Sequence, residues 1–198
     1  MAMVALACWS PQVALACVWA QDYAWYSNMA ILFALNVTKQ RYPYNYLLLL
    51  ALTLSTGTTV ASASAYYYYS GSASAVLSAG VLTAVAFVSL SLYAQLSGTD
   101  FSWMRGGLYS GLAMLCALYF CQWLGAFAPQ LWTAYFGVAL FGGFVLYDTD
   151  RISKRDGMSL DDYIVGATEL YLDIVNIFLH LLRIFGESER KDDGKRRK

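Results

Sequence analysis

The feature that most constrains this chain is a succession of long apolar segments joined by short connections. Five of them approach the length of about 20 apolar residues that an α-helix needs to cross a bilayer core. They are Leu15–Val37, Tyr44–Ala65, Ala73–Leu96, Trp103–Ala126 and Leu131–Tyr147. A sixth segment, Asp162–Phe185, is as long but contains ionisable residues. Short connections make successive helices antiparallel. The sequence therefore predicts an all-α polytopic transmembrane helix bundle.

The first segment is the weakest, because Gln21 and Asp22 fall inside it. A shorter helix from Tyr23, tilted or beginning at the membrane interface, fits equally well. The apolar stretch Met1–Ala20 has no basic region of the kind that begins a cleavable signal peptide, and Pro11 interrupts it. We therefore expect six to seven helices. The expected connections are Thr38–Pro43, Tyr66–Ser72, Ser97–Ser102, Phe127–Gln130 and Asp148–Leu160.

Composition agrees with a membrane protein. Hydrophobic residues make up 59% of the chain and charged residues 13%, whereas soluble domains carry about 25% charged residues. We expect one transmembrane domain, residues 1–186, followed by a basic polar tail, residues 187–198. The expected partner is the lipid bilayer, and no nucleic-acid partner is expected.

Basic residues indicate the orientation of the bundle. They lie in, or just after, the three connections that alternation places on one side, at Lys39, Arg41, Arg105, Arg151, Lys154 and Arg155. Basic connections favour the cytoplasmic side. The tail's basic residues favour the same side, but the length of the last segment favours a full span that would put the tail on the other. The side of the tail stays open.

The last segment carries a polar seam. At about 100° per residue along a helix, five polar or ionisable side chains fall within an arc of about 80°. They are Glu169, Asp173, Asn176, His180 and Arg183. Ionisable groups inside a bilayer are costly and face a bundle interior or a water-filled cavity. The seam is either an ion- or proton-linked pathway or a structural hydrogen-bond spine, and the number of acids favours the pathway.

A further acid, Asp148, ends the fifth segment, which is the antiparallel neighbour of the sixth. If Asp148 and Asp173 meet, they titrate as a coupled pair. A shared proton then acts as a pH-sensitive latch. Its loss leaves either two repelling carboxylates or a site for a cation that prefers oxygen ligands. Asp148 and Asp173 are accordingly candidate calcium ligands.

Catalytic signatures are missing from the sequence. It contains no G-x-S-x-G, H-E-x-x-H or P-loop pattern. Its single histidine and four cysteines, which form no C-x-x-C, do not support a zinc site. We expect no enzymatic activity and no cofactor.

Several of these segments resemble the transmembrane Bax inhibitor motif family, and most closely its lifeguard branch. The resemblance is most specific in Phe144–Thr149, Asp162–Ile164 and Leu170–Arg183. It continues in Arg41–Asn45 with the leucine run that follows, and in Thr99–Ser102.

This resemblance implies a seven-helix fold with the last helix at its centre. It also implies residence in endoplasmic reticulum or Golgi-type membranes, control of calcium leak and suppression of cell death. The family's aspartate pair maps onto Asp148 and Asp173 and serves in relatives as a pH sensor held by a basic residue from an earlier helix. Lys39 or Arg41 is the candidate for that residue here. Calcium is then a permeant or bound ion, and other membrane proteins of cell-death control are candidate partners.

Three departures from the family pattern matter. The N-terminal tail and first helix look shortened, which suggests a truncated chain. Thr56 stands where many lifeguard relatives carry a glutamate. Glu169 stands where a small uncharged residue is usual, one turn before Asp173, where it can partly replace the missing acid.

Two other functions remain open from the sequence. The chain can be a non-conducting regulator that acts through contacts with other membrane proteins, in which case the seam is structural. A proton-coupled transporter is the weaker reading, because the inverted repeats of many transporters are not evident.

Overall fold

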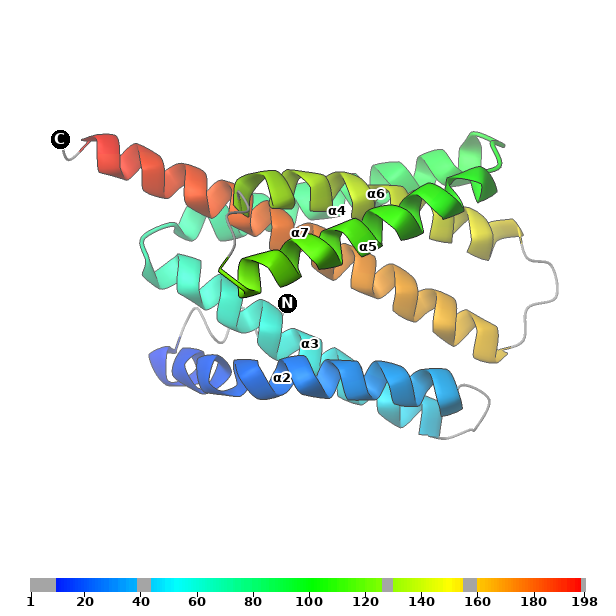
Figure 1. The fold of residues 1–198 in the computed structure, drawn as a ribbon, viewed down its shortest axis with the longest axis horizontal. Coiled ribbons are helices and arrows are strands. Elements are labelled where there is room, and N and C mark those ends of the chain that lie inside the picture. Colours follow the sequence, from blue (N-terminus) through cyan, green and yellow to red (C-terminus); the bar gives the residue numbers. More distant parts are fainter. Residues whose placement is uncertain (1–9, 39–43, 126–129, 155–159, 197–198) are drawn as a thin grey trace. The chain divides into compact units, whose positions relative to one another are not determined.

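The computed structural model describes residues 10–38, 44–125, 130–154 and 160–196. All the regular structure in these ranges is helical. The elements are α2 (Pro11–Thr38), α3 (Tyr44–Tyr69), α4 (Ala73–Leu96), the short 3-10 helix η1 (Ser102–Met104), α5 (Arg105–Trp123), α6 (Gln130–Lys154) and α7 (Leu160–Arg196). Figure 1 shows them in chain order from blue to red. The predicted all-α class is confirmed.

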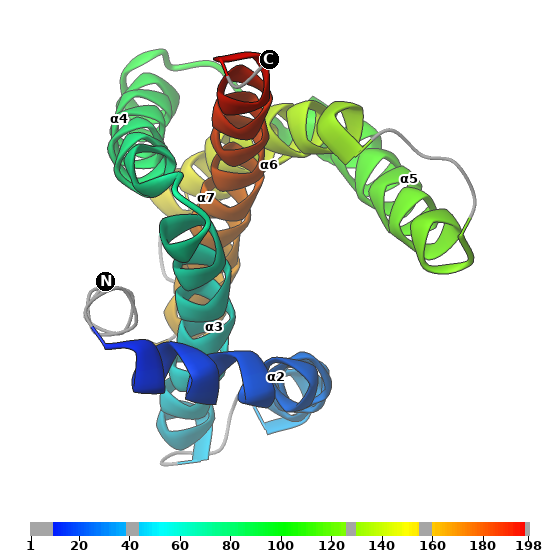
Figure 2. The ribbon, with the colours of Figure 1, turned by 90° about the vertical axis from the view of Figure 1, so that its left-hand side faces the viewer.

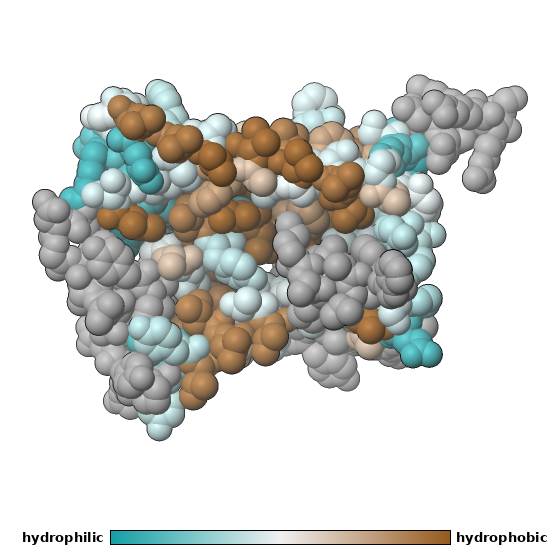
Figure 3. Space-filling model, turned by 180° about the vertical axis from the view of Figure 1, so that it is seen from behind, coloured by the Kyte–Doolittle hydropathy of each residue, from teal (hydrophilic) through white to brown (hydrophobic). Residues whose placement is uncertain are grey.

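Four helices in the described ranges are long and apolar enough to cross a membrane, judged by length and composition. They are α3, α4, α6 and the part of α7 from Val165 to Lys191. Large apolar side chains stay exposed along α4, among them Leu77, Val81 and Val85, and Figure 3 shows hydrophobic residues over much of one face. Such a surface is unfavourable in water and suits lipid. The chain is a polytopic membrane protein.

Several helices begin or end at residues other than those predicted. Helix α2 begins at Pro11, ahead of the predicted start at Leu15. Proline suits the first position of a helix, where its missing N–H has no helical partner to lose. Helix α3 continues to Tyr69, so the first four residues of the predicted connection Tyr66–Ser72 are helical. The predicted connections 39–43 and 127–129 lie outside the described residues.

The largest corrections concern the last two helices. Asp148 does not end a helix, because α6 continues to Lys154. Two basic residues lie in its last turn, where their positive charge interacts favourably with the helix dipole. Helix α7 continues through the predicted boundary at residue 187 to Arg196, so most of the predicted tail is helical. The Glu, Lys and Arg residues of this stretch are good helix formers, which explains why the helix continues beyond its apolar part.

The chain divides into two compact units. The first contains α2, α3 and the start of α7 up to Thr168. Here α2 packs along α3, and the hydroxyl groups of Ser27 and Ser55 form a hydrogen bond of 2.7 Å between the two helices. Small and hydroxylated residues let membrane helices approach closely, which agrees with the many such residues on α3.

The second unit contains most of α4, together with α5, α6 and α7 from Glu169 onward. Within it, α7 contacts all three other helices. Phe178 lies against Gly80 of α4, and the ring of His180 stacks on aromatic rings of α5 and α6. Figure 2 shows this part of α7, in orange to red, with α4 on one side of it and α5 on the other. The predicted central position of the last helix is confirmed within this unit.

Candidate functional site: a buried carboxyl pair between two helices

Asp148 of α6 and Asp173 of α7 are both buried, with 5% and 6% of their surface exposed. Their carboxyl groups lie close enough to interact electrostatically with each other. An ionised carboxylate only accepts hydrogen bonds, so two carboxyl groups can bond to each other only when one keeps its proton. Two carboxyl groups in this position are therefore able to share one proton between two helices.

A third acid and a base lie beside the pair. Glu169, one turn before Asp173 on α7, acts electrostatically on both aspartates. Its carboxylate accepts a hydrogen bond of 2.8 Å from Arg151 Nη1. Arg151 follows Asp148 by three residues on α6, which puts both on one face of that helix. The side chains of Arg151 and Glu169 are 28% and 38% exposed, so they are the more accessible part of the site.

Arg151 was not predicted as a site residue, because in the sequence it appeared only as one of several basic residues in a connection. The predicted basic partners, Lys39 and Arg41, lie outside the described residues. Arg151 follows Asp148 by three residues, and within a helix this spacing puts both on the same face. The sequence did not show that α6 continues to Lys154, so the spacing could not be used.

One oxygen of the pair lacks a protein partner. Asp173 Oδ2 is buried and makes no hydrogen bond within the described part of the chain. Buried polar atoms in folded proteins are rarely left without a partner. This oxygen therefore has hydrogen-bonding capacity that the described residues do not use.

The rest of the predicted seam forms a separate group. Asn176 turns back on its own helix and donates a hydrogen bond of 2.8 Å to the carbonyl of Leu172. His180 is buried between two aromatic rings, with ring centroids 6.3 Å from Tyr119 and 5.7 Å from Phe141. The structure thus brings Glu169 and Asp173 together with Asp148, and it places Asn176 and His180 in other surroundings.

Arg183 belongs with His180 rather than with the acids. Its guanidinium lies 6.0 Å from the centroid of the Tyr119 ring, within reach of a cation–π interaction. Its Nη1 atom is buried without a hydrogen-bond partner among the described residues. The aromatic partners on α5 and α6 were not predicted, because they come from helices whose contacts the sequence does not reveal.

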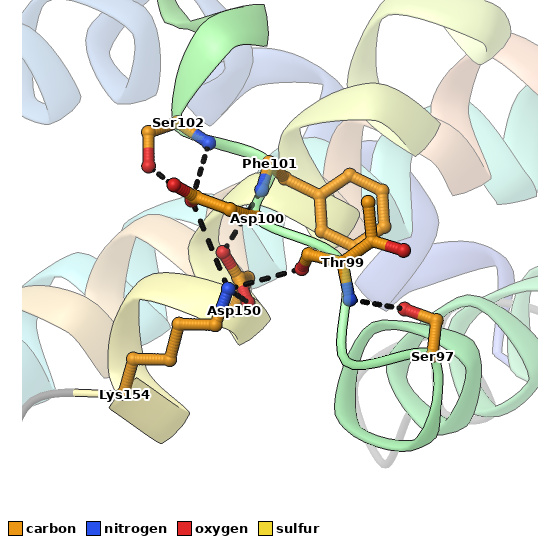
Figure 4. A network of polar contacts seen from close by, with 7 residues as sticks. All are labelled: Ser97, Thr99, Asp100, Phe101, Ser102, Asp150 and Lys154. Carbon is orange, nitrogen blue, oxygen red and sulfur yellow. Dashed lines mark hydrogen bonds and ion pairs between the residues drawn. The ribbon is translucent and has the colours of Figure 1, made fainter.

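A second polar network lies at the end of α6, on residues that follow Asp148 (Figure 4). Asp150 and Lys154 bind the connection between α4 and α5 there. Next to them is a cavity of about 240 Å³ lined by Asp100, Ser102, Tyr147, Asp150, Arg151 and Lys154. In the exposed connection, hydrogen bonds from Ser102, with a smaller contribution from Lys154, hold the pKa of Asp100 below its ordinary value.

The aspartate pair alone does not supply the ligands of a stable calcium site. Calcium in a stable protein site takes about six to eight oxygen ligands. Across the described residues, no three or more Asp, Glu, His or Cys side chains gather in a way that could hold a metal ion. Two carboxyl groups supply at most four oxygens, fewer than such a site needs.

The sequence matches the family described as "Inhibitor of apoptosis-promoting Bax1" over residues 1–190. The chain belongs to this family. Among relatives of the Bax1-inhibitor family, it is 36% identical to Protein lifeguard 4 of Mus musculus over 117 residues, which cover 59% of this chain and 48% of the mouse protein. It is also 36% identical over 120 residues to the Golgi anti-apoptotic protein of Vaccinia virus (strain Lister), covering 59% and 48%.

A bacterial protein belongs with these relatives. Inner membrane protein YbhL of Escherichia coli (strain K12) is 37% identical over 123 residues, which cover 58% of this chain and 53% of the bacterial protein. The chain thus spans about half the length of the curated relatives it matches. Membership of the Bax1-inhibitor family and the membrane setting are thereby established.

Proposed function

We propose that this protein is a pH-modulated calcium leak pathway of endomembranes that suppresses cell death. The observation that carries the proposal is the burial of Asp148 and Asp173 on two neighbouring helices, where their carboxyl groups interact electrostatically. A buried ionisable pair in a membrane helix bundle is typical of an ion or proton pathway.

The chemistry of the pair supplies the latch. With one proton shared, the two carboxyl groups are joined by a hydrogen bond that ties α6 to α7. Loss of that proton leaves two negative charges in contact, with Glu169 adding a third nearby. Mutual repulsion then favours separation of the helices, and the uncovered oxygens attract a divalent cation. Calcium flux should therefore rise as pH rises through the titration of the shared proton.

The biological part of the proposal draws on the names of the relatives. One relative is called a Golgi anti-apoptotic protein and another carries the lifeguard name. We extend suppression of cell death, and residence in Golgi-type or endoplasmic reticulum membranes, to this chain. Controlled calcium leak would link the two, because a lower calcium load in a store leaves less to release during a death signal.

Purified protein in liposomes loaded with calcium and a calcium dye provides the test. Efflux is measured between about pH 5.5 and pH 8 for the wild type, Asp148→Asn and Asp173→Asn. We expect efflux from the wild type to increase with pH. Each asparagine keeps the shape of the side chain but cannot ionise, so neither variant can place two negative charges side by side. In both variants, efflux should therefore lose the rise with pH that this repulsion causes.

A matched substitution controls for altered packing. Asn176→Ala removes a polar side chain from the same helix, at a residue whose amide bonds to its own backbone. It adds no charge beside the pair, so it should leave the pH profile in place. Efflux that stays pH-dependent in both asparagine variants would remove the pair from the mechanism. No efflux from any variant would reject the channel in favour of a non-conducting regulator that acts through contacts with other membrane proteins.

A further inference from the structure

The last two turns of α6, residues 148–154, make contacts in two directions. Asp148 and Arg151 face α7, where they meet Asp173 and Glu169. Asp150 and Lys154 instead face the connection between α4 and α5. A single stretch of helix therefore carries both the carboxyl of the proposed latch and the contacts that hold this connection.

The contacts with the connection are specific and involve its backbone. Asp150 Oδ2 accepts a hydrogen bond of 3.1 Å from the amide of Phe101. Lys154 Nζ donates one of 3.0 Å to the carbonyl of Thr99. The ammonium of Lys154 also lies 2.7 Å from Asp150 Oδ1, so one oxygen of Asp150 holds the loop and the other holds the lysine. Figure 4 shows these residues converging, and we call this set of contacts the loop clamp.

Burial makes the loop clamp stronger than a surface ion pair. The side chain of Asp150 is 6% exposed and that of Lys154 46% exposed. The ring of Phe101, also buried, packs edge-on against Tyr93 of α4 at a centroid distance of 6.0 Å. A buried carboxylate without hydrogen-bond partners is destabilised by the full free energy of its desolvation. The contacts of Asp150 with Phe101 and Lys154 are therefore strongly favoured.

We propose that Asp150 and Lys154 are positioning residues that couple the α4–α5 connection to the turn of α6 carrying Asp148. While the loop clamp is closed, it fixes the register of that turn and keeps Asp148 against Asp173. Release of the connection loosens the turn and opens the adjoining cavity, which Arg151 also lines. The inference rests on the proposed function for its consequence, but the coupling itself is a property of the fold.

The sharpest variant exchanges the two charged residues, Asp150→Lys with Lys154→Asp. The exchange keeps an ion pair of spacing four on α6. It removes both bonds to the connection, because a lysine cannot accept from the Phe101 amide and an aspartate cannot donate to the Thr99 carbonyl. Asp100→Asn is the matched control, since Asp100 is 70% exposed, lies 3.7 Å from Lys154 and makes neither of these bonds.

Hydrogen exchange of the full protein in lipid nanodiscs, followed by mass spectrometry, measures the coupling without any assay of function. In the exchanged variant, the amide of Phe101 and those of residues 149–154 should exchange about tenfold faster or more, because a hydrogen bond to a charged group changes an opening equilibrium by roughly that factor. Amides in the middle of α4 should keep their wild-type rates. Lys154→Arg, which still donates to the Thr99 carbonyl, should exchange at the wild-type rate. Lys154→Met, which cannot donate, should exchange faster.

Two results would overturn the inference. One is unchanged exchange at Phe101 in the exchanged variant, which would mean that these bonds do not hold the connection. The other is faster exchange at Phe101 with unchanged exchange in residues 149–154, which would mean that the connection and α6 move independently.

Calcium efflux then tests the consequence. The exchanged variant should leak several-fold more than the wild type at the acidic end of the pH range, where the shared proton keeps the latch closed. Faster exchange along α6 with wild-type efflux would reject the link between clamp and latch. Failure of the proposed function has a different signature, because the wild type itself would then show no efflux while the exchange results stand.

Discussion

Glycine at residue 137 sets how closely α6 approaches α7. A methyl group at Gly137 would overlap the imidazole ring of His180, which is itself held between Tyr119 and Phe141. The ring cannot move aside without disturbing two further aromatic contacts. The glycine is therefore required by packing, and the histidine is a buried contact residue in this structure.

Gly137→Ala should destabilise the protein by about 1–3 kcal/mol, the usual cost of forcing an extra methyl into a packed interior. Thermal unfolding in detergent, followed by loss of helical signal, provides the measurement. Gly142→Ala is the control, because a methyl there meets only Leu90 at an ordinary contact distance of 3.5 Å. Equal melting temperatures for the two variants would show that the close approach at Gly137 is not required.

The charges beside the aspartate pair should shift its response to pH in opposite directions. Arg151 favours loss of the shared proton and Glu169 opposes it, because a nearby positive charge favours the ionised carboxylates and a negative charge disfavours them. Arg151→Gln should therefore move the midpoint of the efflux profile to higher pH, and Glu169→Gln should move it to lower pH. Each shift should be about half a pH unit, since both side chains are partly exposed and solvent screens their charges.

The double variant Arg151→Gln with Glu169→Gln serves as the internal control for this pair of predictions. Removing both charges should return the midpoint close to that of the wild type. Efflux profiles in liposomes provide the measurement. Shifts in the same direction for both single variants would mean that the substitutions act through structure rather than through charge.

At the scale of elements, the end of α3 shows how local chemistry stops a helix. The amide of Ser72 donates to the carbonyl of Tyr67 and that of Gly71 to the carbonyl of Tyr68. This is the hydrogen-bond pattern of a Schellman motif. It requires a left-handed residue after the helix, which Gly71 supplies with a φ of 91°. The short turn into α4 depends on that glycine.

Gly71→Ala should cost about 1 kcal/mol of stability, because a Cβ is disfavoured in the left-handed region. Gly106→Ala in α5 is the matched control. It also has open space around it but lies within a helix, where alanine is favoured over glycine, so it should be neutral or stabilising. The midpoint of thermal unfolding in detergent provides the measurement. An unchanged midpoint for Gly71→Ala would show that the turn does not require a glycine.

Helix length is the property of the elements that was hardest to predict. The apolar segments located α3 to α7 correctly, because hydropathy is a local property that reports which residues suit lipid. Their ends were misplaced wherever polar residues continue a helix, as at Asp148–Lys154 and at Glu187–Arg196. Helix formation depends on backbone propensity and packing rather than on hydropathy, so a polar continuation is not visible as a break.

At the scale of the whole molecule, the sequence by itself determined the class of protein and the acids of the candidate site. Long apolar runs leave a chain no stable form in water, and the helical period alone places Glu169 and Asp173 on one face of α7. Only the tertiary structure decided their partners. Arg151 beside Glu169, the aromatic rings around His180, and Asp150 with Lys154 on the α4–α5 connection all depend on side-chain packing between helices. The helical period shows which side chains share a face of one helix. Which residue of another helix they contact depends on the distance between the two helices, which the period does not give.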